Sequence, residues 1–191
     1  MAQGKKNARR LRAHLVFLDE SGFLLIPPLQ RTWAPRGQTP ILRHRYRRDK
    51  LSVISAITMS PTRRRLGLYY QIFADNVTQL DMAAFLRNLL RHLRQHVILV
   101  WDQAAQHKGD PIAAVCRDHP RLHLEYLPAY APELNPDEFV WRQAKQQLTN
   151  NCPDHLDTLF DQVITVLGMI AHEPDRLRAC FQHADLPFDF N

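Results

Sequence analysis

At residues 97–108 the sequence is VILVWDQAAQHK, five apolar residues followed at once by an aspartate. A continuous apolar run of this length is typical of a central strand that a sheet buries on both faces. We therefore predict a strand over 97–101 that ends at Asp102, and a helix that follows over 108–118.

The segments on either side of this strand give the order of the elements. Before it, the run Leu15–Leu18 predicts a short strand that a turn closes at Asp19, and residues 51–59 and 66–73 predict an antiparallel hairpin whose first strand is half-buried. Apolar residues three and four positions apart over 82–93 and 156–170 indicate two amphipathic helices. We also expect a strand over 122–126 and a helix from Pro136. Strands and helices in this order predict an α/β fold, a mixed sheet with helices packed on it.

Composition limits the number of domains and the kind of partner. The chain of 191 residues suits one domain, which we place at 14–191 after a basic arm or linker remnant at 1–13. Its net charge of +6 favours a polyanionic partner. We expect no membrane segment, because no apolar stretch approaches the ~20 residues that a spanning helix needs. Three scattered cysteines without a C-x-x-C pair, and the lack of a secretory signal, predict a cytoplasmic location.

Three acidic residues stand beside predicted elements in positions that suit a metal site. Asp19 ends the first strand, Asp102 ends the strand over 97–101, and Glu138 lies in the first turn of the helix from Pro136. Oxygen ligands are those that Mg²⁺ and Mn²⁺ prefer, and rigid elements hold such ligands in place. Two ions about 3.5–4 Å apart can activate an attacking oxygen and stabilise a leaving one in phosphoryl transfer. We therefore expect the three carboxyl groups to converge on one site.

Each of these residues also has a simpler structural interpretation. Asp102 could cap the following helix, and Asp19 could hydrogen-bond within its turn. Glu138 could complete a capping box by reaching back to the amide of Asn135.

The neighbours of the candidate residues have structural interpretations too. Glu20 and Asp137 are expected to point elsewhere, because successive strand residues face opposite sides and successive helical residues differ by ~100°. Trp141, one turn beyond Glu138, is expected in the core. His107, beside Lys108, could contact a phosphate or orient a ligand, although a solvated helix start explains the pair equally well.

Three blocks of the sequence resemble the catalytic core of bacterial insertion-sequence transposases of the Tc/mariner superfamily. They are HLVFLDESGF (14–23), VILVWDQAAQHK (97–108) and LPAYAPELNPDEFVWRQAK (127–145). The resemblance implies an RNase H-like fold, a mixed five-stranded sheet flanked by helices. It also implies that Asp19, Asp102 and Glu138 are the catalytic residues and the ligands of two Mg²⁺ or Mn²⁺ ions. One departure is Gln103, since the family usually has Asn after the second Asp.

The function that this resemblance implies is that of a DDE transposase, a magnesium-dependent endonuclease and strand transferase. Its partner would be double-stranded DNA, both at the transposon ends and in the target. Each 3′-OH freed by hydrolysis would attack the target in a second in-line displacement. Because no helix-turn-helix modules precede His14, we expect a separately encoded subunit, an upstream reading frame or a truncated chain. A homodimer and a bacterial, nucleoid-associated location fit this function.

Basic residues predict where the DNA backbone would bind. Arg43, Arg45 and Arg47 alternate, so in extended chain they project to one side, as residues of a solvated basic edge also would. Contacts of this kind position a duplex without reading its sequence. The predicted DNA-binding residues are Arg43, Arg45, Arg47, Arg48, Lys50, Arg63, Arg64, Arg65, His107 and Lys108.

Two other functions are compatible with these residues. An inactive or truncated remnant would keep the fold and bind DNA without cutting it, and metal binding at the three carboxylates separates the two cases. Another RNase H-like nuclease would act on RNA–DNA hybrids or junctions, and its substrate distinguishes it.

Overall fold

The computed structural model describes residues 10–26, 33–38, 41, 49–151 and 153–186. In this part of the chain a five-stranded sheet has the order β3-β2-β1-β4-β5. The strands are β1 (His14–Leu24), β2 (Lys50–Met59), β3 (Leu66–Phe73), β4 (Val97–Trp101) and β5 (Leu122–Tyr126). β2 is antiparallel to β1 and β3, whereas β4 and β5 run parallel to β1. The mixed five-stranded sheet is therefore confirmed.

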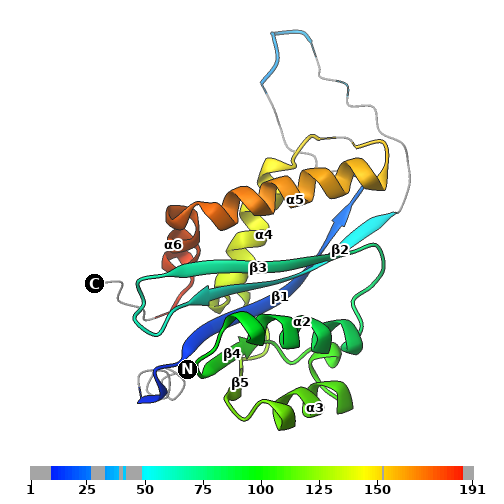
Figure 1. Cartoon of the computed structure of the whole chain (residues 1–191). Helices are drawn as coiled ribbons and strands as arrows, with labels where there is room; N and C mark the ends of the chain where they lie inside the picture. Colours follow the sequence, from blue (N-terminus) through cyan, green and yellow to red (C-terminus); the bar gives the residue numbers. More distant parts are fainter. Residues whose placement is uncertain (1–9, 27–32, 39–40, 42–48, 152, 187–191) are drawn as a thin grey trace.

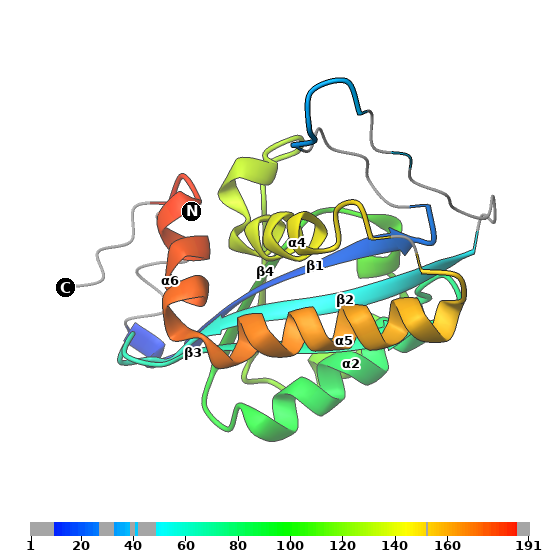
Figure 2. The same cartoon turned by 90° about the horizontal axis from the view of Figure 1, so that it is seen from above.

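Helices cover both faces of the sheet (Figure 1). One face carries α4 (Pro136–Gln147), α5 (Leu156–His172) and α6 (Pro174–His183), and the other carries α2 (Gln79–His92) and α3 (Asp110–Asp118). Seen from above, α5 runs along β2 and β3 (Figure 2), and α4 packs on β1. Each face has its own apolar core. None of the described helices is long and apolar enough to span a bilayer.

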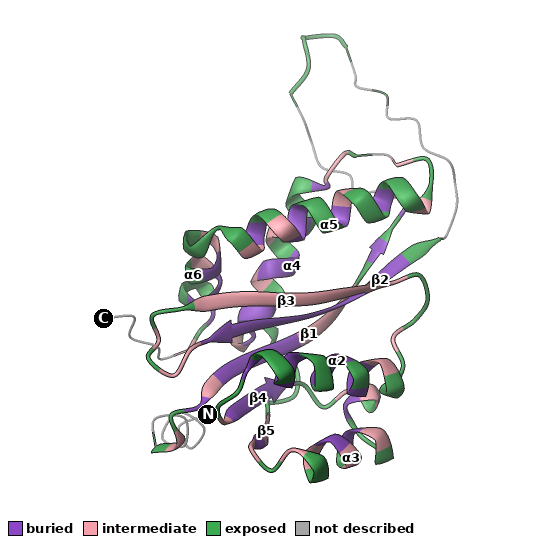
Figure 3. Ribbon diagram, in the orientation of Figure 1, coloured by how far each residue is buried: buried purple, intermediate pink, exposed green. Residues whose placement is uncertain are grey.

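β2 is more deeply buried than its sequence predicts (Figure 3). We expected a half-buried strand, but Ile54 and Ala56 are as fully buried as Val53 and Ile57, which face the opposite side. The reason is that β2 lies inside the sheet and helices cover both of its faces. The half-buried interpretation is therefore wrong.

β1 is longer than predicted, and this changes the place of Asp19. The strand does not end in a turn at Asp19, because Glu20, Ser21 and Gly22 remain paired with β2. Ladder hydrogen bonds with β2 thus outweigh the local turn tendency of Ser-Gly. What ends near Asp19 is the pairing with β4, which covers only His14–Phe17 of β1.

Candidate active site

The sheet brings Asp19 and Asp102 to the same edge. The parallel ladder pairs Phe17 of β1 with Val100 of β4, so each aspartate stands two residues beyond this pair on its own strand. Because parallel strands run in step, the two residues occupy matching positions where β4 ends.

α4 supplies the third acidic residue. Its start is well defined, because the side chain of Asn135 accepts a hydrogen bond from the Asp137 backbone N–H and Pro136 occupies the first turn. Glu138 follows in that turn, with an exposed side chain.

Asp19, Asp102 and Glu138 line one cavity of about 480 Å³. The connection between β5 and α4 forms much of its wall, from Leu127 to Pro132, and Gln103 also lines it. Three residues from distant parts of the sequence therefore share one open site. Among the described residues, however, no three His, Cys, Asp or Glu side chains are close enough to form a ready-made metal cluster. Mutual repulsion of unneutralised carboxylates favours such a spread arrangement.

The simpler structural interpretations of Asp102 and Glu138 do not hold. Asp102 is not a helix cap, because Gly109 precedes α3 and Ala104 precedes the 3-10 turn Ala105–His107. The Asp102 carboxylate instead accepts a hydrogen bond from the Ala104 backbone N–H at 2.9 Å. The backbone N–H of Asn135 donates to Pro132 at 2.9 Å, so Glu138 does not close a capping box with it.

The fold changes the ionisation of Asp19. Burial, and then the nearby charge of Glu138, raise the pKa of Asp19 to about 7. Hydrogen bonds from the Glu20 backbone N–H (2.9 Å) and from Trp141 (3.2 Å) act in the opposite direction. An added cation in the cavity would stabilise the charged form.

Asp137, next to Glu138, turns into the protein as its helical position predicts. Its side chain is fully buried and its Oδ1 accepts a hydrogen bond of 2.7 Å from the Ser55 hydroxyl. Burial raises the pKa of Asp137 well above its usual value, and the charges of Asp19 and Glu138 add to this effect. Asp137 therefore supports the cavity from beneath and does not line it.

His107 joins Asp102 to Glu20. Its Nε2 lies 2.9 Å from Glu20 Oε1, and its Nδ1 lies 2.7 Å from Asp102 Oδ1. Burial alone would lower the pKa of His107, but the hydrogen bond and charge of Glu20, with those of Asp102, outweigh it and raise the pKa. Since the side chain is fully buried, its geometry favours the orienting role over contact with a phosphate.

A family model described as DDE superfamily endonuclease matches residues 14–159, which include the three carboxylates and the cavity wall. The chain belongs to this family. No curated protein sequence matches it.

Solved structures share the fold of this DDE endonuclease. The Mos1 transposase paired-end complex with left transposon end has a TM-score of 0.61 at 17% identity, over 96% of this chain and 59% of that one. The catalytic domain of Mos1 mariner transposase gives 0.54 at 14%, over 98% and 89%. A simian T-cell lymphotropic virus intasome with a PP2A regulatory subunit gives 0.53 at 10%, over 83% and 48%. The RNase H-like fold is thereby confirmed, while the chain spans only 59% of the length of the first match.

The residues of the endonuclease cavity suit a divalent cation. Its three carboxylates are hard oxygen ligands. Burial, and then the charge of Glu138, raise the pKa of Asp19, and a cation nearby would offset both effects. Mg²⁺ usually takes only one or two protein carboxylates and keeps waters and phosphate oxygens. An open cavity with spread ligands therefore fits such an ion better than a closed cage would.

The described part of the chain contains only some of the predicted DNA-binding residues. Arg43, Arg45, Arg47 and Arg48 lie outside the described residues. Lys50 and Lys108 are exposed. Arg63, Arg64 and Arg65 lie in the connection between β2 and β3. The last residue of β2, Met59, pairs with Leu15, which lies four residues before Asp19 on β1. At 3.3 Å per residue this leaves about 13 Å of strand between them and the carboxylate edge.

Two features of the endonuclease site are not among the predictions from the sequence. Tyr130 lines the cavity with a fully exposed side chain and a backbone φ of 57°, which is unusual for a residue with a Cβ. Its place in the LPAYAPELNP stretch, between two prolines, was the available signal. Trp141 is in the core as expected, but the bond from its indole to Asp19 was not foreseen.

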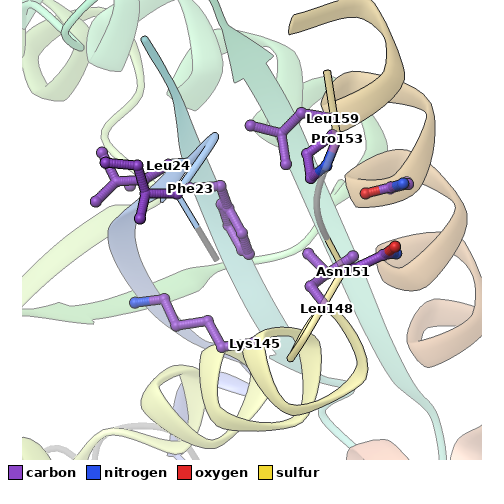
Figure 4. Close-up of a pocket in the computed structure, with 10 residues that line it drawn as sticks. Phe23, Leu24, Lys145, Leu148, Asn151, Pro153 and Leu159 are labelled. Atoms are coloured by element: carbon purple, nitrogen blue, oxygen red, sulfur yellow. The ribbon is translucent and has the colours of Figure 1, made fainter. Parts of the chain in front are cut away.

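A second pocket of about 380 Å³ lies between the end of β1, α4 and α5 (Figure 4). Its lining is largely apolar and includes Phe23, Leu148 and Leu159, with Lys145 at its side. It contains none of the three carboxylates. The first cavity, and not this pocket, is therefore the candidate active site.

Proposed function

We propose that this chain is the catalytic domain of a transposase that cuts DNA at transposon ends and joins the freed 3′-OH to target DNA. The observation that carries the proposal is the cavity that Asp19, Asp102 and Glu138 share in a DDE superfamily endonuclease. The likeness in fold to Mos1 complexes, one with a transposon end and one a strand transfer complex, supports the same conclusion.

Asp19, Asp102 and Glu138 would hold two Mg²⁺ or Mn²⁺ ions. Mos1 paired-end complexes are known with Mn and with Mg, which supports the choice of metal. Bound ions would activate the attacking oxygen and stabilise charge on the leaving one. The protein's own part is to hold the carboxylates on rigid elements: Asp19 within β1, Asp102 directly after β4 and Glu138 on the first turn of α4. Cleavage and strand transfer would use the same site, because only the attacking oxygen differs.

The setting of this activity belongs to the same proposal. The chain would derive from a bacterial insertion sequence and act on nucleoid DNA in the cytoplasm. A homodimer would bring two transposon ends together, and a helix-turn-helix subunit or an upstream frame would read their sequence. Phosphate contacts would come from Arg43, Arg45, Arg47, Arg48, Lys50, Arg63, Arg64, Arg65 and Lys108.

The test is the substitution Asp102→Asn, which keeps the shape of the side chain and removes its charge. We expect it to lower Mg²⁺- or Mn²⁺-dependent cleavage by on the order of 10²-fold or more, while folding and most DNA binding persist. The substrate is pre-nicked or transposon-end DNA, supplied with any separate DNA-binding subunit. Asp118→Asn is the matched control, because Asp118 is exposed at the end of α3, away from the cavity.

Two outcomes would overturn the proposal. Equal cleavage by Asp102→Asn and wild type would remove Asp102 from the mechanism. Wild-type protein that binds DNA but neither binds Mn²⁺ nor cuts would identify the chain as a DNA-binding remnant.

A further inference from the structure

His107 is held more firmly than a solvated residue after a strand would be. Its side chain is fully buried, and its ring stacks on that of Trp101 with centroids 4.4 Å apart and planes 6° from parallel. Trp101 is the last residue of β4 and is itself fully buried. The ring plane of His107 is therefore fixed by the sheet.

Both ring nitrogens of His107 have oxygen partners. Nε2 is hydrogen-bonded to Glu20 Oε1 at 2.9 Å, and Nδ1 is hydrogen-bonded to the Asp102 backbone oxygen at 3.2 Å. The second oxygen of Glu20 accepts a hydrogen bond of 3.2 Å from the side-chain amide of Gln106. Glu20 on β1 thus binds two consecutive residues of the segment that follows Asp102.

These contacts fix one oxygen of Asp102 and not the other. Oδ1 lies 2.7 Å from His107 Nδ1 and accepts the Ala104 backbone N–H at 2.9 Å. Oδ2 takes part in neither contact, and the side chain is 56% exposed while it lines the cavity. The arrangement leaves Oδ2 available for a ligand while the rotamer is held from behind.

We propose that Glu20 and His107 form a positioning pair that holds Asp102 in the geometry in which its carboxylate binds a metal ion. The proposal rests on the proposed function, in which Asp102 is such a ligand. A buried charged pair adds little net stability over an apolar pair of the same shape, so stability alone does not account for it. Residues that orient a metal ligand from behind typically change metal affinity ~10–100-fold when they are replaced.

The experiment measures Mn²⁺ binding to the protein without DNA, by the electron paramagnetic resonance signal of free Mn²⁺. His107→Phe keeps a ring to stack on Trp101 and removes both nitrogens, and Glu20→Leu removes the other end of the pair. We expect each to weaken Mn²⁺ binding by ~10-fold or more. The double variant should be no weaker than either single one, because the two residues act as a unit. His172→Phe, an exposed histidine on α5, is the control and should leave binding unchanged.

Glu20→Gln separates positioning from charge. Gln keeps an oxygen that can accept a hydrogen bond from the His107 Nε2–H. Mn²⁺ affinity should therefore stay within about 3-fold of wild type, much less than the ~10-fold or greater loss expected when an orienting residue is removed. A loss as large as that of Glu20→Leu would show that only the charge of Glu20 matters, and would overturn the positioning role. If His107→Phe fails to fold, the two Glu20 variants still decide the question.

Asp102→Asn distinguishes failure of this inference from failure of the proposed function. If Asp102→Asn abolishes Mn²⁺ binding while folded His107→Phe and Glu20→Leu bind normally, the positioning pair is refuted and the proposed function stands. If Asp102→Asn binds Mn²⁺ like wild type, Asp102 is not a metal ligand, and both the positioning pair and the proposed function are refuted.

Discussion

The indole Nε1–H of Trp141 donates a hydrogen bond of 3.2 Å to Oδ2 of Asp19. Trp141 lies one turn beyond Glu138 on α4, so one helix both supplies an acidic residue and holds another. Its ring is 2% exposed and packs edge-on against Phe23 with centroids 6.0 Å apart. The carboxylate cavity and the core beneath α4 are thus one connected structure.

Trp141→Phe should therefore affect both stability and metal binding. The substitution keeps a ring against Phe23 but leaves the part-buried Asp19 carboxyl without the indole donor, a loss that costs about 1–3 kcal/mol. Because this bond lowers the pKa of Asp19, its removal should raise that pKa further and weaken Mn²⁺ binding at pH 7 several-fold. Urea unfolding and Mn²⁺ titration measure the two effects.

Trp101→Phe is the control for the effect of this substitution on stability. Trp101 Nε1 is buried and has no hydrogen-bond partner in the described part of the chain, so the same change there breaks no such bond. A decrease of stability in Trp101→Phe as large as that in Trp141→Phe would contradict the role of the Trp141 bond.

The sequence predicts the strands of this fold better than the surroundings of its side chains. The apolar run over 97–101 is a buried strand as predicted, because five consecutive apolar residues suit a strand covered on both faces. The turn predicted at Asp19 fails because long-range pairing with β2 decides that segment, and local residue preferences carry no information about it.

For the candidate site too, the sequence predicts which residues come together but not the contacts that hold them. Asp19, Asp102 and Glu138 share a cavity, as the ends of predicted elements and the family resemblance together indicated. The bond from Trp141 to Asp19 spans 122 positions and the contact between His107 and Glu20 spans 87, so neither could be derived from spacing. Such contacts depend on how α4 and the segment after β4 pack on β1.

Asp19 should make the stability of the metal-free protein fall as pH rises. Its pKa is about 7 in the fold against an ordinary value of 3.8, so between these the native state holds a proton that the unfolded chain has released. The contribution of Asp19 to stability is then full below the unfolded pKa and declines up to pH 7, by at most about 4 kcal/mol. Urea unfolding with a chelator, at intervals from pH 4 to 8, measures the decline.

Asp19→Asn should flatten this pH profile. The amide satisfies only one of the donors from Glu20 and Trp141, so the absolute stability shifts by a constant, but the slope attributable to Asp19 disappears. Asp137 is present in both proteins, but the charge of Asp19 raises its pKa, so the difference between the profiles reports Asp19 together with this coupling. Parallel profiles for the two proteins would mean that Asp19 is already ionised in the fold.

Ser55→Ala should destabilise the protein by about 1–3 kcal/mol, because it leaves the buried Asp137 carboxyl without the hydroxyl that donates to it at 2.7 Å. The pKa of Asp137 should rise further, since the Ser55 bond lowers it. Ser52→Ala, at a buried serine of the same strand, is the matched control. Chemical unfolding at pH 7 measures both stabilities, and a cost no larger than that of Ser52→Ala would count against the Ser55–Asp137 bond as a support of the cavity.

DNA binding should depend on two groups of arginines that act independently. Replacing Arg43, Arg45 and Arg47 with Ala should lower the slope of log K against log[salt] by up to ~3 units, about one unit for each arginine that binds a phosphate. Replacing Arg63, Arg64 and Arg65 tests the hairpin group, which lies about 13 Å of strand from the carboxylate edge. The two effects should add if the groups bind separate phosphates, since distant sites share no partner.

The control is the double replacement of Arg176 and Arg178, which are ion-paired with Glu173 and Asp175 on α6 and should leave the slope unchanged. If either triple variant keeps the salt dependence of wild type, as the control should, its three arginines form only a solvated basic edge.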